Sequence, residues 1–394
     1  MIKTGIGELD GYLLGGIPKG KSLLFYTDPG VEGEKLGLQS IYNNLSCGKN
    51  VIYVISSISS DRAKESFQEL GWKIDTFGEK LTIIDGYSAL IGDQTEKMVM
   101  VEDPYDIENY EDVLEGQISV FSNNCMVVFE SLSTIIDMCG EKETLKKIAS
   151  WNEVFQERKI TSIYNFIAWP YAGTILNKLR RLFDAVIDVC SISERVIIGQ
   201  CYCPTKIKWG GKIGDSVPFR VYKPGGVKNY IPKICVIGLH NAGKSSFIES
   251  LSMKSLSNKK IESNITVEHG FIKHAGFTVD ILGIQGDQDI KSFVETIKED
   301  IIGIFLVIDS TNPSQFIWTK KVLDDIRLDG LPVIIVANKQ DVKNAVTTEE
   351  IEKKMRIPPD IPVIPTVATE GKNVLSAYEK LIEIITKRNI YGKQ

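Results

Sequence analysis

The chain has 394 residues, of which 43% are hydrophobic and 25% charged, with 33 glycines and 14 prolines. This length exceeds the size at which a single hydrophobic core usually keeps growing, so two compact domains are expected. The composition excludes a collagen-like or disordered chain. The formal net charge of −5 argues against a protein whose main partner is nucleic acid.

The cysteines and the hydropathy pattern indicate the cellular compartment. The seven cysteines are scattered and odd in number, which suits a reducing compartment better than a disulfide framework. No apolar run reaches the length of a membrane span, and the first residues lack a signal-peptide core. We therefore expect a cytoplasmic protein without a direct membrane anchor.

Short apolar runs rich in β-branched residues alternate with helix-like stretches along the chain, a pattern typical of α/β folds with largely parallel sheets. The expected strands of the first half are Ser22–Tyr26, Val51–Ile55, Leu81–Ile84, Met126–Phe129 and Ile160–Ile167, followed by a β-rich end with Val196–Tyr202 and Val217–Tyr222. Those of the second half are Lys233–Ile237, Phe277–Leu282, Ile304–Ile308, Val333–Ala337 and Val363–Thr366. Because residues 204–232 are rich in Gly and Pro, we expect domains at 1–225 and 233–394 with a linker at 226–232.

The start of the chain carries a recognisable segment. Residues 5–20 read Gly-Ile-Gly-Glu-Leu-Asp-Gly-Tyr-Leu-Leu-Gly-Gly-Ile-Pro-Lys-Gly and precede the first expected strand. This segment resembles the entry of RecA-, KaiC- and RadA-type ATPases, and the resemblance extends over residues 1–225. It implies a RecA-like fold with an ATP phosphate loop at residues 27–36.

That phosphate loop departs from the family pattern. Glu34 intrudes between Gly33 and Lys35, and places a negative charge where phosphate would lie. Leu36 stands where a hydroxyl would bind Mg²⁺.

The acidic residues that this resemblance implies are also missing. The stretch after the strand Val51–Ile55 reads Ser56-Ser57-Ile58-Ser59, and Glu130 replaces the aspartate after the strand Met126–Phe129. A longer glutamate is a poor substitute in a tight Mg²⁺ shell. We therefore expect the first domain to keep a RecA-like fold without ATPase activity.

The second half opens with a phosphate-binding motif. The apolar run Lys233–Ile237 is followed by Gly-Leu-His-Asn-Ala-Gly-Lys-Ser over 238–245, a full match to G-x-x-x-x-G-K-[ST] between a strand and a helix. Lys244 is expected to neutralise the β- and γ-phosphates, and Ser245 to place its hydroxyl on Mg²⁺. The other phosphate-cradle candidates are Gly238, Asn241, Ala242, Gly243 and Ser246.

A second motif predicts the base. Asn338-Lys339-Gln340-Asp341 follows the expected strand Val333–Ala337. An aspartate here accepts hydrogen bonds from the N1–H and 2-amino groups of guanine, which adenine does not offer, so the site would reject ATP.

These motifs, with the segment 366–374 that reads Thr-Val-Ala-Thr-Glu-Gly-Lys-Asn-Val, resemble a Ras-superfamily small GTPase, closest to the Arf-like branch, over residues 233–388. The resemblance implies a six-stranded sheet flanked by helices, Mg²⁺-dependent GTP or GDP binding, and switch loops read by partners. It also implies that the N–H of Ala368 reads guanine O6, and it adds Asn338, Lys339, Asp341 and Thr369 to the nucleotide site. The fold class is then α/β, with two P-loop NTPase-type domains in tandem, RecA-like and small-GTPase-like.

The D-x-x-G-Q motif of that family is altered here, and three registers are open. Asp280 with Gly283 keeps the Mg²⁺-side aspartate and the γ-phosphate glycine, but moves Gln285 one place late. Aligning Gln285 directly puts Ile284 at the glycine and loses the aspartate.

In the third register, Gly286 is the γ-phosphate glycine, Gly283 stands for the aspartate, and Asp287 for the catalytic glutamine. The candidate catalytic residues are therefore Gln285 and Asp287. The other switch leaves Ser263 or Thr266 as a further Mg²⁺ ligand.

The leading interpretation is a GTP-binding switch with slow hydrolysis, in which the inactive RecA-like domain regulates, scaffolds or oligomerises. One alternative is a scaffold that holds GTP without cycling, and another is an ATP-dependent RecA-type protein with an accessory GTPase domain. The expected partners are a protein effector or regulator at the switch loops and a second copy or a related RecA-like chain. Nucleic acid is not expected, and the domain pairing suggests an archaeal source.

Overall fold

The computed structural model describes residues 1–92, 99–121, 124–192, 199–252, 257–262, 265–274, 277–285, 300–328 and 330–391, with the single positions 294 and 297. It divides into two compact units, one of residues 1–192 and 199–229 and one that includes the chain from Tyr230 onward. Within the described ranges, no helix has the length and apolar character needed to cross a bilayer.

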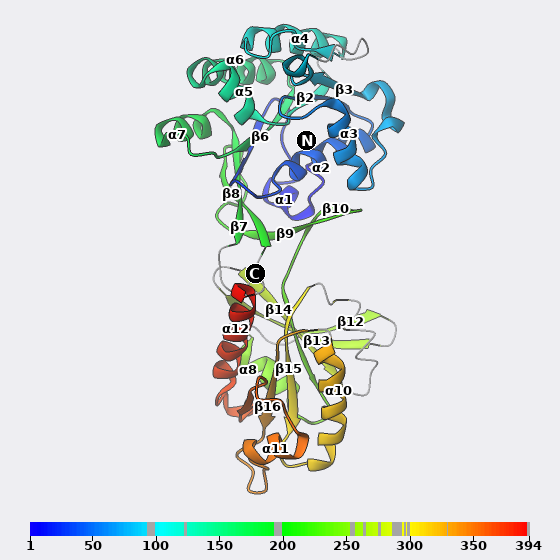
Figure 1. Cartoon of the computed structure of the whole chain (residues 1–394), viewed down its shortest axis with the longest axis vertical. Coiled ribbons are helices and arrows are strands. Elements are labelled where there is room, and N and C mark those ends of the chain that lie inside the picture. Colours follow the sequence, from blue (N-terminus) through cyan, green and yellow to red (C-terminus); the bar gives the residue numbers. More distant parts are fainter. Residues whose placement is uncertain are drawn as a thin grey trace. The chain divides into compact units, whose positions relative to one another are not determined.

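The first unit is built on a ten-stranded sheet with the order β10-β9-β8-β7-β1-β6-β5-β2-β3-β4 (Figure 1). From β7 to β4 all neighbours are parallel, whereas β7, β8, β9 and β10 pair antiparallel. The strands are β1 (Ser22–Thr27), β2 (Asn50–Ile55), β3 (Leu81–Asp85), β4 (Val99–Met100), β5 (Cys125–Phe129), β6 (Thr161–Ile167), β7 (Ala185–Ile192), β8 (Gly199–Ile207), β9 (Val217–Tyr222) and β10 (Gly226–Asn229).

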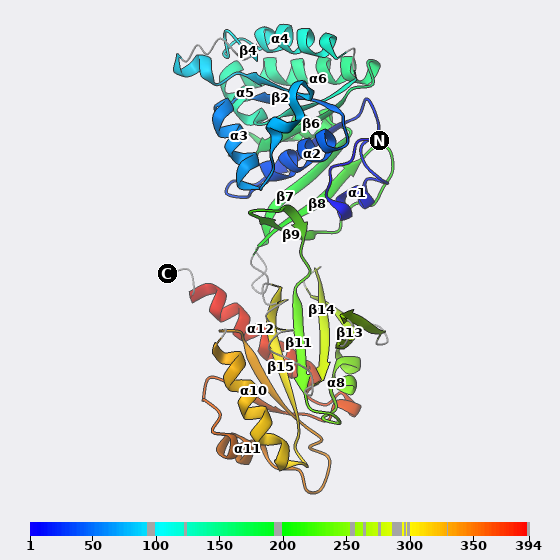
Figure 2. The same ribbon diagram turned by 90° about the vertical axis from the view of Figure 1, so that its right-hand side faces the viewer.

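Helices cover both faces of this sheet, because successive side chains of its buried strands point to opposite sides. Leu23 and Phe25 of β1 enter one core with α2 and α3, whereas Leu24 enters the other with α4, α5 and α6. Figure 2 shows α2 and α3 on one side and α4 and α6 on the other. The helices are α1 (Gly7–Tyr12), α2 (Glu34–Ser46), α3 (Ser60–Glu69), α4 (Ile107–Val120), α5 (Leu132–Cys139), α6 (Glu141–Glu157) and α7 (Gly173–Leu182), with 3-10 turns at Ile74–Lys80 and Ser88–Ile91.

The end of the first unit differs from the expected boundary. Residues 226–232 were expected to form a linker, but Gly226–Asn229 is β10, a strand that pairs with β9. Gly225 and Gly226 have φ of 133° and 79°, which only glycine adopts readily, and they turn the chain back as a hairpin. The unit therefore extends to Asn229, and β7 is a further strand that the apolar pattern did not predict.

The second unit has a seven-stranded sheet with the order β12-β13-β14-β11-β15-β16-β17. β14, β11, β15, β16 and β17 run parallel, and β13 and β12 are added antiparallel. The strands are β11 (Lys233–Gly238), β12 (Ser257–Glu262), β13 (Ile265–His274), β14 (Phe277–Gln285), β15 (Ile301–Asp309), β16 (Val333–Asn338) and β17 (Val363–Pro365). The expected sheet of six strands thus gains β12, whose sequence Ser-Asn-Lys-Lys-Ile-Glu has no apolar alternation.

Helices flank this sheet on two sides, with α8 and α12 on one and α10 on the other (Figure 1). They are α8 (Lys244–Leu251), α10 (Phe316–Leu328), α11 (Thr348–Met355) and α12 (Val374–Tyr391), with 3-10 turns at Pro313–Gln315 and Ala368–Glu370. The parallel strands β11, β15 and β16 place their carboxyl ends at one edge, where ligands of open α/β sheets bind.

Candidate nucleotide-binding site

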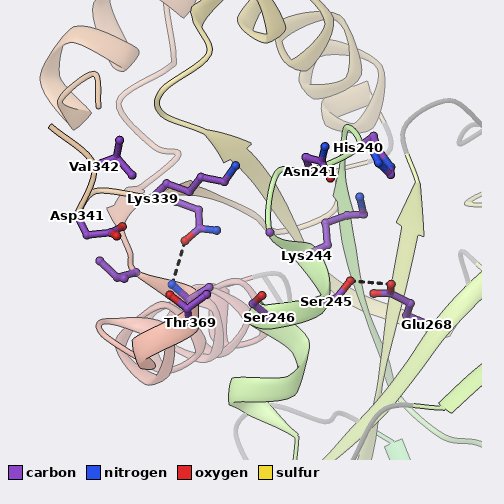
Figure 3. Close-up of a pocket in the computed structure, with 14 residues that line it drawn as sticks. His240, Asn241, Lys244, Ser245, Ser246, Glu268, Lys339, Asp341, Val342 and Thr369 are labelled. Carbon is purple, nitrogen blue, oxygen red and sulfur yellow. Dashed lines mark hydrogen bonds between the residues drawn. The ribbon is translucent and has the colours of Figure 1, made fainter. Parts of the chain in front are cut away.

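A cavity of about 710 Å³ lies at the carboxyl edge of the second sheet (Figure 3). Its lining residues come from four segments that are far apart in the sequence, at 240–246, 268, 338–342 and 367–369. The predicted residues that line it are Asn241, Gly243, Lys244, Ser245, Ser246, Asn338, Lys339, Asp341, Ala368 and Thr369. Val342 and Val367 add apolar wall.

The loop between β11 and α8 curls in a way that needs its glycines. Gly243 has φ of 93°, and a Cβ there would lie 2.1 Å from Asn338 Nδ2. A Cβ at Gly238 would lie 2.4 Å from the carbonyl oxygen of Val307 on β15. Gly238 and the buried Ala242 do not line the cavity but pack behind the loop, whereas Gly243 lets the loop approach Asn338 of β16.

Lys244 and Ser245 open helix α8, whose first backbone N–H groups have no partner within the helix. Only 6% of Lys244 is exposed, and its Nζ donates to the carbonyl oxygen of Leu239 at 3.0 Å. The Lys244 ammonium therefore lies beneath the phosphate loop, beside the positive N-terminal end of the α8 dipole. A phosphate group bound here would be stabilised by both positive charges, that of the ammonium and that of the helix end.

Asn338 joins three of these segments. Its Nδ2 donates to the carbonyl oxygen of Ala242 at 2.9 Å, and its Oδ1 accepts from the N–H of Ala368 at 3.0 Å. The hydroxyl of Thr366 also donates to Oδ1, at 3.3 Å. Because Asn338 is only 3% exposed, these hydrogen bonds are shielded from solvent. They fix the spacing between the phosphate loop and the Ala368 turn.

Lys339 and Asp341 extend from the turn after β16. Lys339 has φ of 65° and pairs with Asp309 at the end of β15, with 2.6 Å between Nζ and Oδ2. Burial acts to raise the pKa of Asp309, but Lys339 and Thr311 outweigh it, so the pKa is lowered and the pair stays charged. Asp341 is exposed at the cavity wall, where its carboxylate is open to a ligand.

The pairing of strand β14 excludes one of the three registers of the altered motif. Gln285 pairs with Gly238, the last residue of β11, whereas Asp280 pairs with Lys233, the first. Asp280 is therefore about 16 Å from the phosphate loop along the strand, and its Oδ1 contacts His269 Nε2 at 3.2 Å. The register that makes Asp280 the Mg²⁺-side aspartate is wrong, because that carboxylate lies at the opposite edge of the sheet.

The other predicted switch residues are only partly described. The backbone of Gln285 ends β14 beside the phosphate loop, and that of Thr266 pairs with Lys260 of β12. Gly286, Asp287 and Ser263 lie outside the described residues. Their roles stay predictions.

Glu268 of β13 is a site residue that the sequence reasoning missed. Its Oε1 accepts a 2.7 Å hydrogen bond from the hydroxyl of Ser245, while Oε2 is buried and has no hydrogen-bond partner within the described residues. Figure 3 shows the two side chains pointing toward each other. Glu268 pairs with Gly283 on the adjacent strand, and a Cβ at Gly283 would lie 2.5 Å from Ile248 Cδ1 and 3.2 Å from Oε2 of Glu268, so the glycine leaves room for both side chains.

Carboxylate and hydroxyl oxygens are hard ligands of the kind that Mg²⁺ prefers. Ser245 and Glu268 therefore fit the ion that the motif implies. No group of three or more metal-ligating side chains lies within the described residues. A Mg²⁺ ion here would be held by these two side chains and the phosphates of its nucleotide, as is usual for this ion.

At the corresponding edge of the first sheet, the loop side chains contact one another and neighbouring strands. Lys35 is 7% exposed, and its Nζ lies 3.5 Å from Oε1 of Glu34. Glu32 is bound at its N–H and its carboxylate by Gln200 of β8, at 2.7 and 2.9 Å. A Cβ at Gly33 would lie 2.0 Å from Oγ1 of Thr27, so this loop is packed onto β1.

Glu130, at the end of β5, occupies the place of the missing aspartate and is tied to the end of β2. It accepts from the N–H groups of Ser56 and Ser57, at 3.2 and 3.0 Å, and from the Ser57 hydroxyl at 2.6 Å. The Glu130 carboxylate therefore accepts its hydrogen bonds from groups of the same chain. Burial raises the pKa of Glu130, against the lowering effect of these bonds.

This raised pKa predicts a pH dependence. The folded state holds the proton of Glu130 to higher pH than the unfolded state, so its contribution to stability falls as pH rises from the ordinary carboxyl range toward neutrality. We expect Glu130→Gln, which cannot ionise, to gain stability relative to the wild type over that interval. Urea unfolding at several pH values measures this. The exposed Glu157→Gln controls for net charge, and a constant difference between wild type and Glu130→Gln would contradict the prediction.

Comparisons with known proteins match the two units to two families. Residues 224–385 match the ADP-ribosylation factor family, and residues 2–168 match the KaiC ATPase family. A solved KaiC-like protein from Pyrococcus horikoshii shares 18% identity with a TM-score of 0.49, covering 58% of this chain and 98% of its own.

Curated relatives align with the second unit. ADP-ribosylation factor-related protein 1 of Rattus norvegicus is 28% identical over 129 residues, which is 30% of this chain and 64% of that protein. This chain thus spans less than two thirds of the length of that relative. ADP-ribosylation factor-like protein 3 of Caenorhabditis elegans is 31% identical over 134 residues, covering 32% of this chain and 70% of that protein. With a KaiC-like domain at its N-terminus, the chain belongs through its C-terminal domain to the ADP-ribosylation factor family of small GTPases.

Proposed function

We propose that this protein is a guanine-nucleotide switch, in which the C-terminal domain binds GTP or GDP with Mg²⁺ and the KaiC-like domain has no ATPase activity. The observation that carries the proposal is the bridge made by Asn338. The Asn338 side chain bonds to Ala242 of the phosphate loop and to Ala368 of the base-side turn, and so sets the distance between these two segments. A nucleotide that reaches from Lys244 to Asp341 matches this cavity, with phosphates at one end and guanine at the other.

The proposed role of Mg²⁺ rests on the pair Ser245 and Glu268. When bound, the ion would neutralise charge on the phosphates. Ser245 and Glu268 hold their oxygens 2.7 Å apart, close to the spacing of neighbouring ligands of a small ion. Hydrolysis would be slow, because neither remaining register keeps the complete D-x-x-G-Q set, and the residue that positions water is Gln285 or Asp287.

Glu268→Gln tests this pair. We expect the apparent Mg²⁺ affinity of the GDP complex to fall about tenfold or more, because the loss of a group that only orients a metal ligand already costs about ten- to a hundredfold. Titration of Mg²⁺ into the GDP complex, followed by nucleotide release, measures it. Glu249→Gln, an exposed change on the same helix as Ser245, is the matched control. A variant that binds GTP more tightly would instead show that the carboxylate obstructs the γ-phosphate.

The KaiC-like domain is proposed as a regulatory or assembly platform. In its phosphate loop Lys35 is paired with Glu34 and Glu32 is bound by Gln200, and nearby Glu130 is bound by the end of β2. We further propose that a protein effector or regulator reads the switch loops, that the KaiC-like domain associates with a second copy or a related chain, and that the protein acts in the cytoplasm.

Hydrolysis measurements on the purified full chain test the proposed switch. We expect slow multiple turnover of GTP and no turnover of ATP. Complete retention of GTP, even with cell extract added, would favour the scaffold that holds GTP without cycling, for which the altered D-x-x-G-Q motif is the supporting observation. ATP hydrolysis that is lost in Lys35→Ala would contradict the inactive platform.

A further inference from the structure

A second cavity lies in the KaiC-like unit, at the opposite ends of the strands from its phosphate loop. It has a volume of about 400 Å³ and is lined by Cys125, Met126 and Thr161 at the starts of β5 and β6. The phosphate loop follows Thr27 at the carboxyl end of the parallel strand β1, so the two places are at opposite edges of one sheet.

The charge of this cavity is strongly positive. Lys19, Lys49, Arg158 and Lys159 line it, and no carboxylate lies among the described residues of its wall. This is a local excess of four cations in a chain whose net charge is −5. Like charges gathered around one concave surface repel one another and focus a positive potential into it.

The contacts of these cations within the chain leave that potential in place. Arg158 approaches Glu115 only to 3.8 Å, and 51% of the Glu115 side chain is exposed, so the pair neutralises little. Lys49 donates to the carbonyl oxygen of Met1 at 3.3 Å, a contact that leaves its charge uncompensated. An anion in the cavity would relieve the repulsion.

The backbone fixes the spacing of three of these cations, Lys19, Arg158 and Lys159. Helix α6 ends at Glu157 with Arg158 as its C-cap residue, and Lys159 turns the chain toward β6 with φ of 58°, an uncommon conformation for a residue other than glycine. Gly20 has φ of 77°, and a Cβ there would lie 2.9 Å from the carbonyl oxygen of Gln156. The turn that carries Lys19 is thus pressed against the end of α6.

We propose that this cavity binds a compact ligand with several phosphate charges. Its volume falls at the small end of the usual range for ligand cavities, about 300–1,000 Å³. The described residues of its wall include no aromatic ring for stacking against a base, so recognition depends on charge and on polar groups such as Asn124 and Thr161. Such phosphates exist free in solution and on phospholipid headgroups, which share this chemistry.

Calorimetric titration of the full chain with pyrophosphate and tripolyphosphate tests the proposal. Because the loop at 238–245 also takes phosphate, the titration is done in Lys244→Ala as well as in the wild type. We expect one saturable site to remain in Lys244→Ala, with an affinity that falls about tenfold or more when Lys49→Gln and Arg158→Gln are added. Lys142→Gln with Lys146→Gln, two exposed changes on α6, is the charge-matched control.

Vesicles distinguish the two sources of phosphate. Co-sedimentation with phosphatidylcholine vesicles that contain a phosphoinositide bisphosphate, lost in the Lys49 and Arg158 variant, would assign a headgroup; binding of free polyphosphate alone would assign a soluble ligand. Thermal unfolding confirms that each variant is folded, and the single exposed change Lys159→Gln gives a milder second test. The proposal is overturned if Lys244→Ala shows no saturable binding up to about 1 mM, or if the pocket variants bind as tightly as the control.

Discussion

Replacing Lys244 with alanine is expected to weaken GTP binding by about a hundredfold or more, whereas Lys35→Ala leaves it unchanged. The ammonium of Lys244 is buried under its loop beside Leu239, where it would donate hydrogen bonds to two phosphate groups of a bound GTP. Each hydrogen bond to a charged group contributes about 1.5–3 kcal/mol, and two of them account for a factor of this size.

Lys35 is the matched control for that experiment, because it occupies the equivalent place in the KaiC-like unit and is equally buried. Its ammonium is paired with Glu34, so no phosphate is expected to depend on it. Fluorescent GTP titration with both variants measures the difference. Equal losses in the two variants would mean that both units bind nucleotide, contrary to the proposed function.

The second large effect is expected at the base. Asp341→Asn should reduce affinity for GTP by about a hundredfold to ten-thousandfold, because a buried polar mismatch at a hydrogen-bonded base is costly. The amide would turn a donor toward the 2-amino donor of guanine. Xanthine carries an acceptor at that position, so the same variant should gain affinity for xanthosine triphosphate.

Competition among GTP, ATP and xanthosine triphosphate for binding to wild type and Asp341→Asn measures this change in base preference. Asp341 is exposed on the turn after β16, so its replacement leaves the packing of that strand intact. Val342→Ala, one residue along on the cavity wall, tests for general damage to the site. GTP binding that persists in Asp341→Asn would show that another group reads the base.

The sequence was sufficient where function depends on contiguous residues. The motif at 238–245 and the motif at 338–341 each lie directly after a buried strand, and the structure brings both to one cavity. The strands themselves were predictable because parallel strands buried on both faces are continuous apolar runs. The family resemblance then placed Ala368 in the same site.

What could not be predicted depends on pairing across the chain. In the sequence, Glu268 cannot be distinguished from the other polar residues around it. Only the pairing of β13 with β14 places it beside Gly283. In the same way, the hairpin at Gly225 and Gly226 pairs β10 with β9, although the sequence of β10 alone does not predict a strand. A strand held mainly by its neighbours carries little local signal.

Counting nucleotide sites is the most direct test of the central claim. The purified full chain, stripped of nucleotide, would be titrated by calorimetry with GTP, GDP and ATP in the presence of Mg²⁺. The proposed function predicts a single guanine-selective site per chain and no ATP site. A second site that binds ATP and requires Lys35, or the absence of any guanine site, would contradict it.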